Sequence, residues 1–492
     1  MNTDDFFFLL QDPLRKNDRA VQTPAECLTY GELAQRVDMQ ADVLASQGAR
    51  VVASLMDNGT DWILHDLACL RAGVTHVPLP LFFTTEQWRG ALDAAGADSI
   101  TGSLSMKPMA DSLAFQAVDA PQGTRALFRR PAVSTVPANT AKITFTSGST
   151  DRPKGVCIGA HEMLTVAEGL AQATRPLGIR SHMTALPLPV LLENIAGVYA
   201  PLIAGATITI RPLRETGLTG SSRFDAAQFH AALVASGAQS VIVLPQMLRA
   251  YVAWLQATRG RAPDGIRLMS VGGAPVGAEL LVEARALGLP AYEGYGLSEA
   301  CSVQTLNLPG ADCPGSAGRA LPHARLRVTE QGEIEIAGNH AYGYLDQPFP
   351  DRDWLPTGDL GYLDEQGFLH IQGRKGNVLV TGFGRNVSPE WIELRLMSLP
   401  PIAHAVVLGD GEPVLGTVIW PARAADDEAI EACVKCVNQE LPDYARIGPW
   451  RRARADFSAA SGLATANGRP RRRAVLNMHA DLFLPVSSQP LP

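Results

Sequence analysis

Two spacings of hydrophobic positions alternate along roughly the first 370 residues of the chain. Short runs rich in β-branched residues and bounded by Gly or Pro predict strands, as at Val51–Leu55 and Val241–Pro245. Between such runs apolar residues recur every three or four positions, as in Tyr30–Gln47, and this spacing predicts helices. Strands that alternate with helices favour layered α/β domains with largely parallel sheets, so we expect that fold class.

The pattern changes past residue 373. Ala405–Leu408 and Val414–Trp420 predict strands, and Asp426–Glu440 predicts a helix, as in a small α+β domain. A chain of 492 residues also exceeds the size of roughly 250–300 residues at which a single hydrophobic core stops growing. We therefore predict two domains, residues 1–373 and 374–492.

Composition and charge narrow the function. The net charge of -7 gives no electrostatic reason to expect nucleic-acid binding. Seven cysteines scattered through a long chain suit a reducing compartment, so we expect a cytoplasmic protein. The apolar run Phe6–Leu10 lacks the flanks of a signal peptide and is far shorter than the roughly 20 residues that span a bilayer. We expect no transmembrane segment.

The richest chemistry lies in Ile143–Val156, where an apolar strand runs into a loop of hydroxyls, two glycines and one lysine. Such a loop suits a polyphosphate, because glycine lets backbone N–H groups converge, hydroxyls donate to phosphate oxygens and Lys154 supplies a positive charge. The spacing is not that of the Walker motif. An ordinary polar turn is the alternative. The other loop residues with this predicted task are Thr146, Ser147, Gly148, Ser149 and Thr150.

This string resembles the signature loop of the adenylate-forming superfamily, which includes acyl-CoA synthetases, adenylation domains of peptide synthetases and luciferases. Four more motifs follow in the family's order. They are the G-G-A segment in Ser270–Pro275, the Y-G-x-T-E motif in Tyr292–Glu299, the T-G-D motif in Trp354–Gly361 and the G-R pair Gly373 and Arg374. The resemblance is nearest to the long-chain fatty acyl-CoA ligase branch.

The resemblance implies roles for individual residues. Lys154 and Ser298 would serve catalysis, Glu299 the Mg²⁺ that bridges the phosphates, Asp359 the ribose hydroxyls, and Arg374 the ribose and phosphate. A carboxylate suits the ribose because it only accepts hydrogen bonds and can take both diol protons. The remaining residues implied to bind the nucleotide are Gly273, Ala274, Tyr295 and Gly296. The resemblance also implies two αβ sheets and a β-barrel-like subdomain in the large domain, with a small domain that rotates between an adenylating and a thioester-forming pose.

The chain departs from the family near its C-terminus. The family's adenylating lysine falls at Arg469, within Thr465–Arg473. Guanidinium keeps the positive charge and grips phosphate in a bidentate manner, so we expect Arg469 to substitute for the lysine. Compositional drift and loss of adenylation are the two alternatives. At the hinge, where the family has Asp or Lys, this chain has Gly376 beside Lys375.

Leu186–Gly197 sits where the family closes its acyl pocket. Its apolar character favours a fatty or aryl acid over an amino acid, whose ammonium would need a buried carboxylate partner. Glu193 is interpreted either as a pocket residue or as a helix-surface carboxylate that faces water. The predicted pocket residues are Val190, Glu193, Asn194 and Gly272.

The function expected from the resemblance is an AMP-forming acyl-CoA ligase of fatty acid metabolism that uses ATP, Mg²⁺ and CoA. One alternative is the same activation step with another acceptor: the phosphopantetheine of a carrier protein, an amine or an intramolecular hydroxyl. A second alternative, motivated by Arg469, is a non-catalytic protein that binds a nucleotide or an acyl group.

Overall fold

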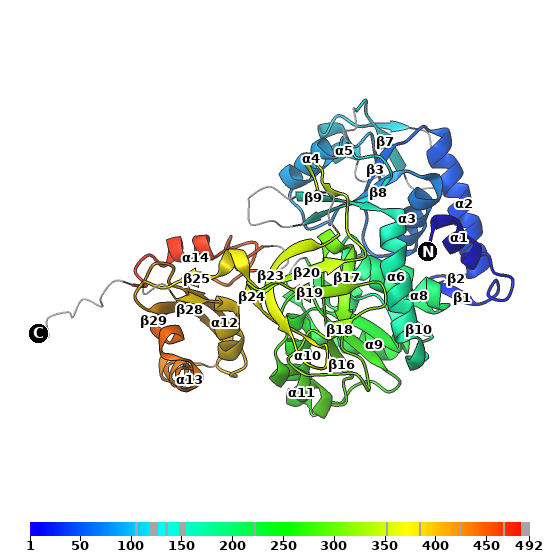
Figure 1. Cartoon of the computed structure of the whole chain (residues 1–492). Helices are drawn as coiled ribbons and strands as arrows, with labels where there is room; N and C mark the ends of the chain where they lie inside the picture. The colour runs from blue at the N-terminus through cyan, green and yellow to red at the C-terminus, as the bar shows by residue number, and fades with distance from the viewer. Residues whose placement is uncertain are drawn as a thin grey trace, which may run out of the picture.

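In the computed structural model the chain forms a large domain and a small one, with β24 (Leu369–Arg374) leading from the first to the second (Figure 1). The structure describes residues 1–103, 107–118, 126–132, 136–146, 154–220, 223–350, 353–382, 385–422, 425–465 and 468–483. The predicted fold class, α/β with a large N-terminal and a small C-terminal domain, is confirmed. The boundary between residues 373 and 374 stays a prediction.

The first sheet of the large domain has nine strands within the described residues. In order they are β22 (Gln347–Pro348), β21 (Gly343–Tyr344), β9 (Lys154–Gly159), β8 (Thr140–Thr146), β4 (Thr75–Pro78), β3 (Val51–Leu55), β5 (Ser99–Gly102), β7 (Ala126–Arg129) and β6 (Gln116–Val118). The central strands β8, β4, β3 and β5 are parallel. Every residue of β3 is buried, as expected for a strand covered on both faces.

The second sheet also has nine strands among the described residues. In order they are β18 (Arg319–Ala320), β17 (Ser302–Leu306), β16 (Ala291–Leu297), β15 (Leu268–Val271), β14 (Ser240–Val243), β10 (Ser181–Met183), β11 (Thr207–Thr209), β1 (Arg19–Gln22) and β2 (Cys27–Thr29). The strand predicted at Val241–Pro245 ends earlier, at Val243. Pro245 instead starts the helix α10, since proline lacks the N–H that a strand needs and fits the first turn of a helix.

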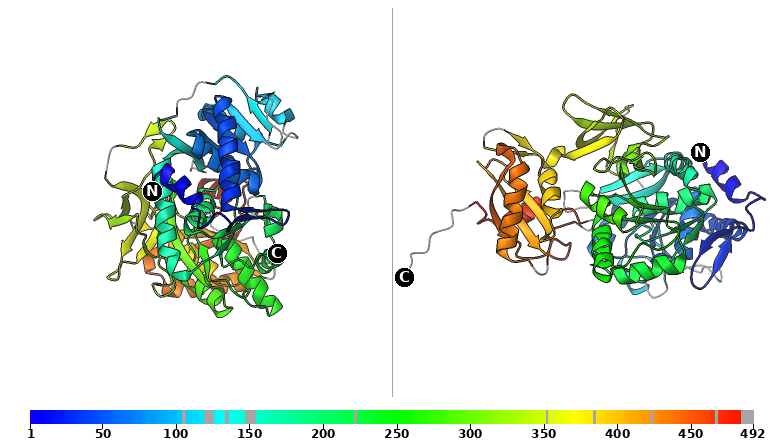
Figure 2. Two further views of the ribbon diagram at one scale, coloured as in Figure 1. Left: turned by 90° about the vertical axis from the view of Figure 1, so that its right-hand side faces the viewer. Right: turned by 90° about the horizontal axis from the view of Figure 1, so that it is seen from below.

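Helices cover both sheets (Figure 2). The predicted helix Tyr30–Gln47 is α2, which begins after Thr29 in a capping box with Glu32 and ends at Ser46. The helices of the large domain are α1 (Thr3–Leu10), α2 (Tyr30–Ser46), α3 (Thr60–Ala72), α4 (Thr85–Ala94), α5 (Lys107–Ser112), α6 (Ala160–Thr174), α7 (Leu191–Asn194), the π-helical η3 (Ile195–Tyr199), α8 (Ala200–Ala204), α9 (Ala226–Ser236), α10 (Pro245–Thr258) and α11 (Ala278–Ala286).

A four-stranded antiparallel sheet stands where the barrel-like subdomain was expected. Its order is β19 (Arg325–Val328), β20 (Glu333–Ala337), β23 (Leu355–Leu363) and β24. The β23–β24 hairpin lies next to the small domain and delivers the chain to it (Figure 1). Residues at the open end of this hairpin are therefore held at the junction of the two domains.

The segment α7–η3 lies at the seam between the two main hydrophobic clusters. One cluster joins α1, α2, α3, α6 and α8, and the other packs the strands β14 and β15 against α9, α10 and α11. Leu192 and Ala196 pack against both clusters. The position of α7–η3 is therefore set by both halves of the large domain.

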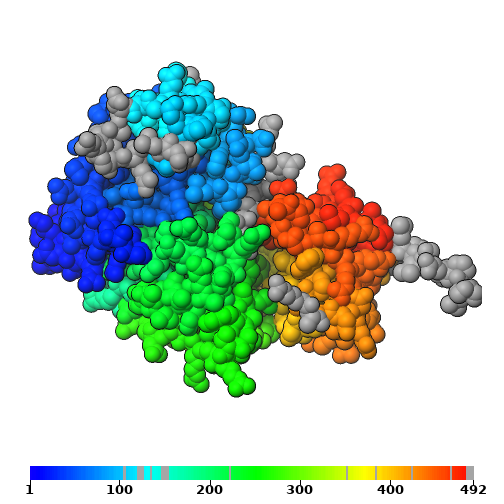
Figure 3. Space-filling model, turned by 180° about the vertical axis from the view of Figure 1, so that it is seen from behind, coloured from blue at the N-terminus to red at the C-terminus, as the bar shows by residue number. Residues whose placement is uncertain are grey.

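The small domain has its own core. It contains β27 (Ile402–Leu408), β28 (Leu415–Pro421), β29 (Ile447–Arg452), α12 (Pro389–Met397), α13 (Asp427–Glu440) and α14 (Arg472–Met478), which agree with the strands and helix predicted there. From behind, its surface borders the green surface of the large domain (Figure 3). Arg249 of α10 donates through Nη1 to the carbonyl oxygen of Met397 at 2.7 Å and so links the domains.

Across the described ranges, no helix is both long enough and apolar enough to cross a membrane.

Candidate functional site

Three predicted site residues meet where β16 faces the β23–β24 hairpin. The antiparallel register pairs Asp359 with Arg374 at the open end of that hairpin. Arg374 Nε donates to Asp359 Oδ1 at 2.6 Å, and the Tyr295 hydroxyl donates to Asp359 Oδ2 at 2.6 Å. Burial and the Asp359 carboxylate raise the pKa of Tyr295 well above its usual range, so the hydroxyl keeps its proton. The trio combines a carboxylate with a guanidinium that has further N–H donors.

Glu299 and Lys154 come together at Tyr344. Glu299 lies in the 3-10 turn η5 (Ser298–Ala300), directly after β16. The Tyr344 hydroxyl donates to Glu299 Oε1 at 2.8 Å, and Lys154 Nζ lies 5.0 Å from the centroid of the Tyr344 ring. The register β8–β9 pairs Lys154 with Thr146, so the predicted phosphate loop spans two adjacent strand ends. Ser147, Gly148, Ser149, Thr150 and the side chain of Thr146 lie outside the described residues.

The glycines of two motifs permit close approaches of the backbone. A Cβ on Gly296 would lie 2.1 Å from the carbonyl oxygen of Ser302 in β17, so a side chain does not fit there. A Cβ on Gly272 would lie 3.3 Å from the carbonyl oxygen of Gly294 and 3.9 Å from Leu192 Cδ2 of α7. Gly272 of the predicted G-G-A segment therefore lies next to β16 and α7, whereas a Cβ on its neighbour Gly273 would lie 3.2 Å from Leu244 Cδ2.

Arg469 reaches this site from the small domain. A tight turn holds it, because Thr465 N–H donates to the Arg469 carbonyl at 2.8 Å and Arg469 N–H donates to Thr465 Oγ1 at 3.2 Å. Burial and the nearby Arg374 guanidinium lower the pKa of Arg469, while Asp359 and Glu299 oppose that shift. The side chain is nevertheless accessible to solvent, so it stands at the edge of the site with protein on several sides. Arg469 therefore belongs to the same electrostatic group as Asp359, Arg374 and Glu299.

The structure revises the picture of the predicted acyl-pocket residues. Glu193 is fully buried: its Oε2 accepts from Leu186 N–H at 3.1 Å and its Oε1 lies 3.2 Å from His182 Nε2. The interpretation of Glu193 as a carboxylate facing water is therefore wrong, and burial raises its pKa. Asn194 is likewise buried, whereas Val190 is half-buried at the start of α7.

Sequence reasoning missed the polar groups that hold this segment. His182 Nδ1 lies 2.9 Å from Ser240 Oγ, so Glu193 belongs to a buried chain of side chains. Asn194 contacts a second buried group, which includes Asp66 and Lys142. These residues come from distant segments and form no linear motif. The one available signal was a single charged residue, Lys142, in the strand β8, whose other residues are Ala, Ile, Phe and Thr.

The predicted hinge has a charged residue, Lys375, beside the uncharged Gly376. Lys375 follows Arg374 directly, and its Nζ lies 2.8 Å from Glu333 Oε2 of β20. Its neighbour Gly376 has open space where a Cβ would stand. The hinge is therefore tied to the four-stranded sheet through Lys375.

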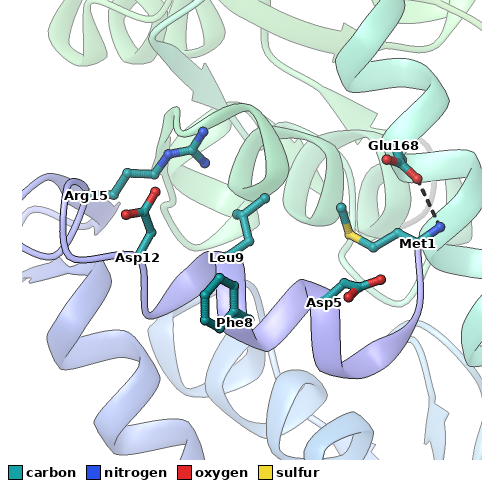
Figure 4. Close-up of a pocket in the computed structure, with 7 residues that line it drawn as sticks. All are labelled: Met1, Asp5, Phe8, Leu9, Asp12, Arg15 and Glu168. Carbon is teal, nitrogen blue, oxygen red and sulfur yellow. Dashed lines mark hydrogen bonds and ion pairs between the residues drawn. The ribbon is translucent and has the colours of Figure 1, made fainter.

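A surface pocket lies on the other side of the large domain. It has a volume of about 560 Å³ and is lined by residues of the N-terminal segment together with Glu168 of α6 (Figure 4). The N-terminal ammonium of Met1 donates to Glu168 Oε2 at 2.9 Å. This pocket shares no residue with the predicted site, so we assign the pocket no part in the chemistry.

Glu299 does not belong to a ready-made metal site. In the described part of the chain, the one cluster of His, Cys or acidic ligand atoms is Cys313, Asp364 and His370. A lone carboxylate is still sufficient for a Mg²⁺ ion that is held mainly by phosphate oxygens and water.

Sequence comparison agrees with the geometry of the site. The chain matches the AMP-binding enzyme family over residues 12–345 and the AMP-binding enzyme C-terminal domain over residues 376–483. It is 27% identical over 420 residues to the 2-succinylbenzoate–CoA ligase of Bacillus subtilis, covering 80% of this chain and 82% of that protein. It is also 27% identical over 547 aligned positions to the long-chain-fatty-acid–CoA ligase FadD15 of Mycobacterium bovis, covering 92% and 91%.

Solved structures share the fold. The anthranilate CoA ligase AuaEII in complex with anthranoyl-AMP matches with a TM-score of 0.81 at 18% identity, over 98% of this chain and 100% of that one. ATP-bound MatB from Rhodopseudomonas palustris matches with a TM-score of 0.81 at 23% identity, over 98% and 100%.

Fold and site together define an adenylate-forming enzyme of the acyl-CoA synthetase type, as the sequence motifs predict. The chain belongs to the AMP-binding enzyme family.

Proposed function

We propose that this enzyme activates a carboxylic acid with ATP as an acyl-adenylate and then transfers the acyl group to the thiol of CoA. The observation that carries the proposal is the Asp359–Arg374 pair at the junction of the two domains, where Arg469 of the small domain is near enough to act electrostatically on Arg374, Asp359 and Glu299. An anion bound near both guanidinium groups offsets the repulsion between Arg374 and Arg469. A nucleotide phosphate supplies that anion.

In the first step a carboxylate oxygen of the acid attacks the α-phosphorus of ATP, and the bond to pyrophosphate breaks. Asp359 accepts hydrogen bonds from the ribose hydroxyls, while Arg374 and Arg469 stabilise the negative charge that builds up on the α-phosphate. Lys154 supplies charge to the phosphate loop. Glu299 would hold Mg²⁺, which would neutralise charge on the phosphates, and the Ser298 hydroxyl would contact the adenylate.

In the second step the thiol sulfur of CoA attacks the acyl carbon, AMP leaves, and the thiol proton passes to solvent. A thioester and AMP are the products. The acid is proposed to be apolar, either a fatty or an aryl acid, because Leu192 lies next to Gly272 and the carboxylate of Glu193 is engaged inside the protein.

Pyrophosphate release by the purified enzyme tests this proposal. We expect release with ATP, Mg²⁺ and one or more members of a series of fatty acids of graded length and aryl acids, together with a thioester when CoA is added. Glu299→Gln keeps the size of the side chain but removes its charge, and should slow release. Failure of every acid to cause release would refute adenylation, and release without thioester formation on CoA would point to another acceptor.

A further inference from the structure

A single buried carboxylate organises the seam between the two halves of the large domain. Asp66 of α3 is 1% exposed and accepts from Lys142 Nζ at 2.8 Å, Asn194 Nδ2 at 2.9 Å and the Tyr199 hydroxyl at 2.9 Å. His76 Nδ1 is a fourth partner. We call Asp66, His76, Lys142, Asn194 and Tyr199 the Asp66 cluster.

The cluster explains why the helix turns π-helical at this point. Asn194 and Tyr199 are five residues apart, which in an α-helix separates two side chains by about 140° around the axis. In the π turn η3, with its i to i+5 hydrogen bond from Ala200 N–H to the Ile195 carbonyl, about 4.4 residues make a turn and the angle falls to about 50°. Both donors can then reach the same oxygen, Asp66 Oδ2.

The Asp66 cluster joins the elements that lead to both substrate regions of the proposed reaction. Lys142 lies on β8, four residues before Thr146, where the predicted phosphate loop begins. Asn194 and Tyr199 lie on either side of Ala196 in the chain, and both follow Leu192. Leu192 and Ala196 are the residues that pack against both hydrophobic clusters. A shift of the π turn would therefore move Ala196 and, through α7, also Leu192 beside Gly272.

The cluster is also saturated with donors, which makes it rigid. Burial alone would raise the pKa of Asp66, but the Lys142 ammonium and His76 lower it well below its usual range, so the carboxylate stays charged. Lys142 Nζ lies 5.1 Å from the centroid of the Tyr199 ring as well. Because four side chains bind the Asp66 carboxylate, it restrains the position of the helical segment α7–η3.

We propose that the Asp66 cluster is a positioning device that sets the acid-binding wall at α7–η3 and ties it to the strand that leads into the phosphate loop. Its members act through Leu192 and Ala196 and do not touch the reacting atoms. This inference rests on the proposed function, because it assigns these residues to the binding of the apolar acid.

Tyr199→Phe tests the device with the smallest possible change. It removes one hydroxyl and leaves the Asp66–Lys142 ion pair in place. The matched control is Tyr251→Phe, which removes the hydroxyl of an equally buried tyrosine, 2.8 Å from His230 Nδ1 in α9. Steady-state kinetics are measured for two apolar acids that differ in length, with thermal unfolding of each variant.

For Tyr199→Phe we expect the KM for the acid to rise about tenfold, with kcat and the KM for ATP within about twofold of the wild type, because ground-state binding of the acid is what the wall provides. The ratio of kcat/KM between the two acids should also change. Tyr251→Phe should leave all these values unchanged at a similar loss of thermal stability.

Three results would overturn the inference. They are an unchanged KM for the acid in Tyr199→Phe, an equal rise of that KM in both tyrosine variants, or a fall in kcat alone. Asn194→Ala, which removes the other donor of the π turn, should change the KM for the acid in the same direction. If the wild type activates no acid, the proposed function fails and this inference fails with it.

Discussion

Two groups of the same chemical type, each a tyrosine hydroxyl and a cation on one aspartate, stand in opposite environments. At the domain junction Arg374 is 42% exposed while it binds Asp359, and Tyr295 completes the group. Inside the large domain Lys142 is 2% exposed while it binds Asp66, and Tyr199 completes that group. The group at the junction, which we call the open group, keeps part of the Arg374 guanidinium accessible to a ligand. In the group inside the large domain, which we call the closed group, Lys142 and Tyr199 donate their hydrogen bonds to the protein itself.

This difference in exposure is the one expected between a ligand site and a structural anchor. An exposed cation on a fixed carboxylate is oriented and still able to bind phosphate. A buried ion pair is costly to desolvate, and its removal from one side leaves an uncompensated charge. The junction group should therefore govern activity, and the buried group should govern stability and the position of α7–η3.

The largest effect is expected from Asp66→Ala. It strands the Lys142 ammonium in the interior, and breaking a buried pair in this way costs about 3–5 kcal/mol of unfolding free energy. Urea unfolding measures the loss. Asp111→Ala is the control, because it breaks an exposed Lys107–Asp111 pair of 3.0 Å and should change stability by less than about 0.5 kcal/mol. Equal losses in the two variants would erase the contrast between the two groups.

Asp359→Asn should show the reverse pattern. It keeps the size of the side chain but removes the charge that holds Arg374, and we expect kcat/KM for ATP to fall about 100-fold, which corresponds to about 2.7 kcal/mol. Pyrophosphate release gives the rate, and thermal unfolding should change by only a few degrees. A variant that unfolds like Asp66→Ala while keeping its affinity for ATP would show that Asp359 is an anchor too.

The sequence predicted the open group and not the closed one, for a physical reason. Asp359 and Arg374 lie in short motifs because the hairpin register brings residues 15 positions apart into contact, and a ligand that touches several neighbouring residues leaves a local pattern. Asp66, Lys142 and Tyr199 meet only after three distant segments have packed. Hydrophobic spacing also predicted β3 and α2 nearly to the residue. It misplaced the end of β14, where the proline belongs to the next helix.

Arg469 tests whether the open group needs the small domain. Arg469→Ala should lower the rate of pyrophosphate release about tenfold, because it removes one of the two guanidinium groups proposed to stabilise charge on the α-phosphate. Arg469→Lys restores a positive charge and should keep adenylation intact or improve it. Neither substitution changes the buried group of Asp66, Lys142 and Tyr199, so the free energy of unfolding should be unaffected. An alanine variant with the wild-type rate would show that Arg469 has no catalytic task.

A third carboxylate, Glu293 of β16, tests whether a neighbouring cation decides the charge of a buried carboxylate. The effect expected here is the smallest. It is buried and accepts from Val276 N–H at 3.3 Å, and burial raises its pKa from 4.5 to about 8, whereas Lys142 and His76 lower that of Asp66. Because the folded state holds this proton more tightly than the unfolded state, the stabilisation is complete below pH 4.5 and is lost as the pH rises through 8. Between pH 7 and 8 the unfolding free energy should fall by about 1 kcal/mol from this group. Glu293→Gln mimics the protonated form and should flatten that slope in urea unfolding at the two pH values. An unchanged slope in the variant would mean that Glu293 is already ionised at pH 7, and that burial without a cation does not set the charge of a carboxylate in this fold.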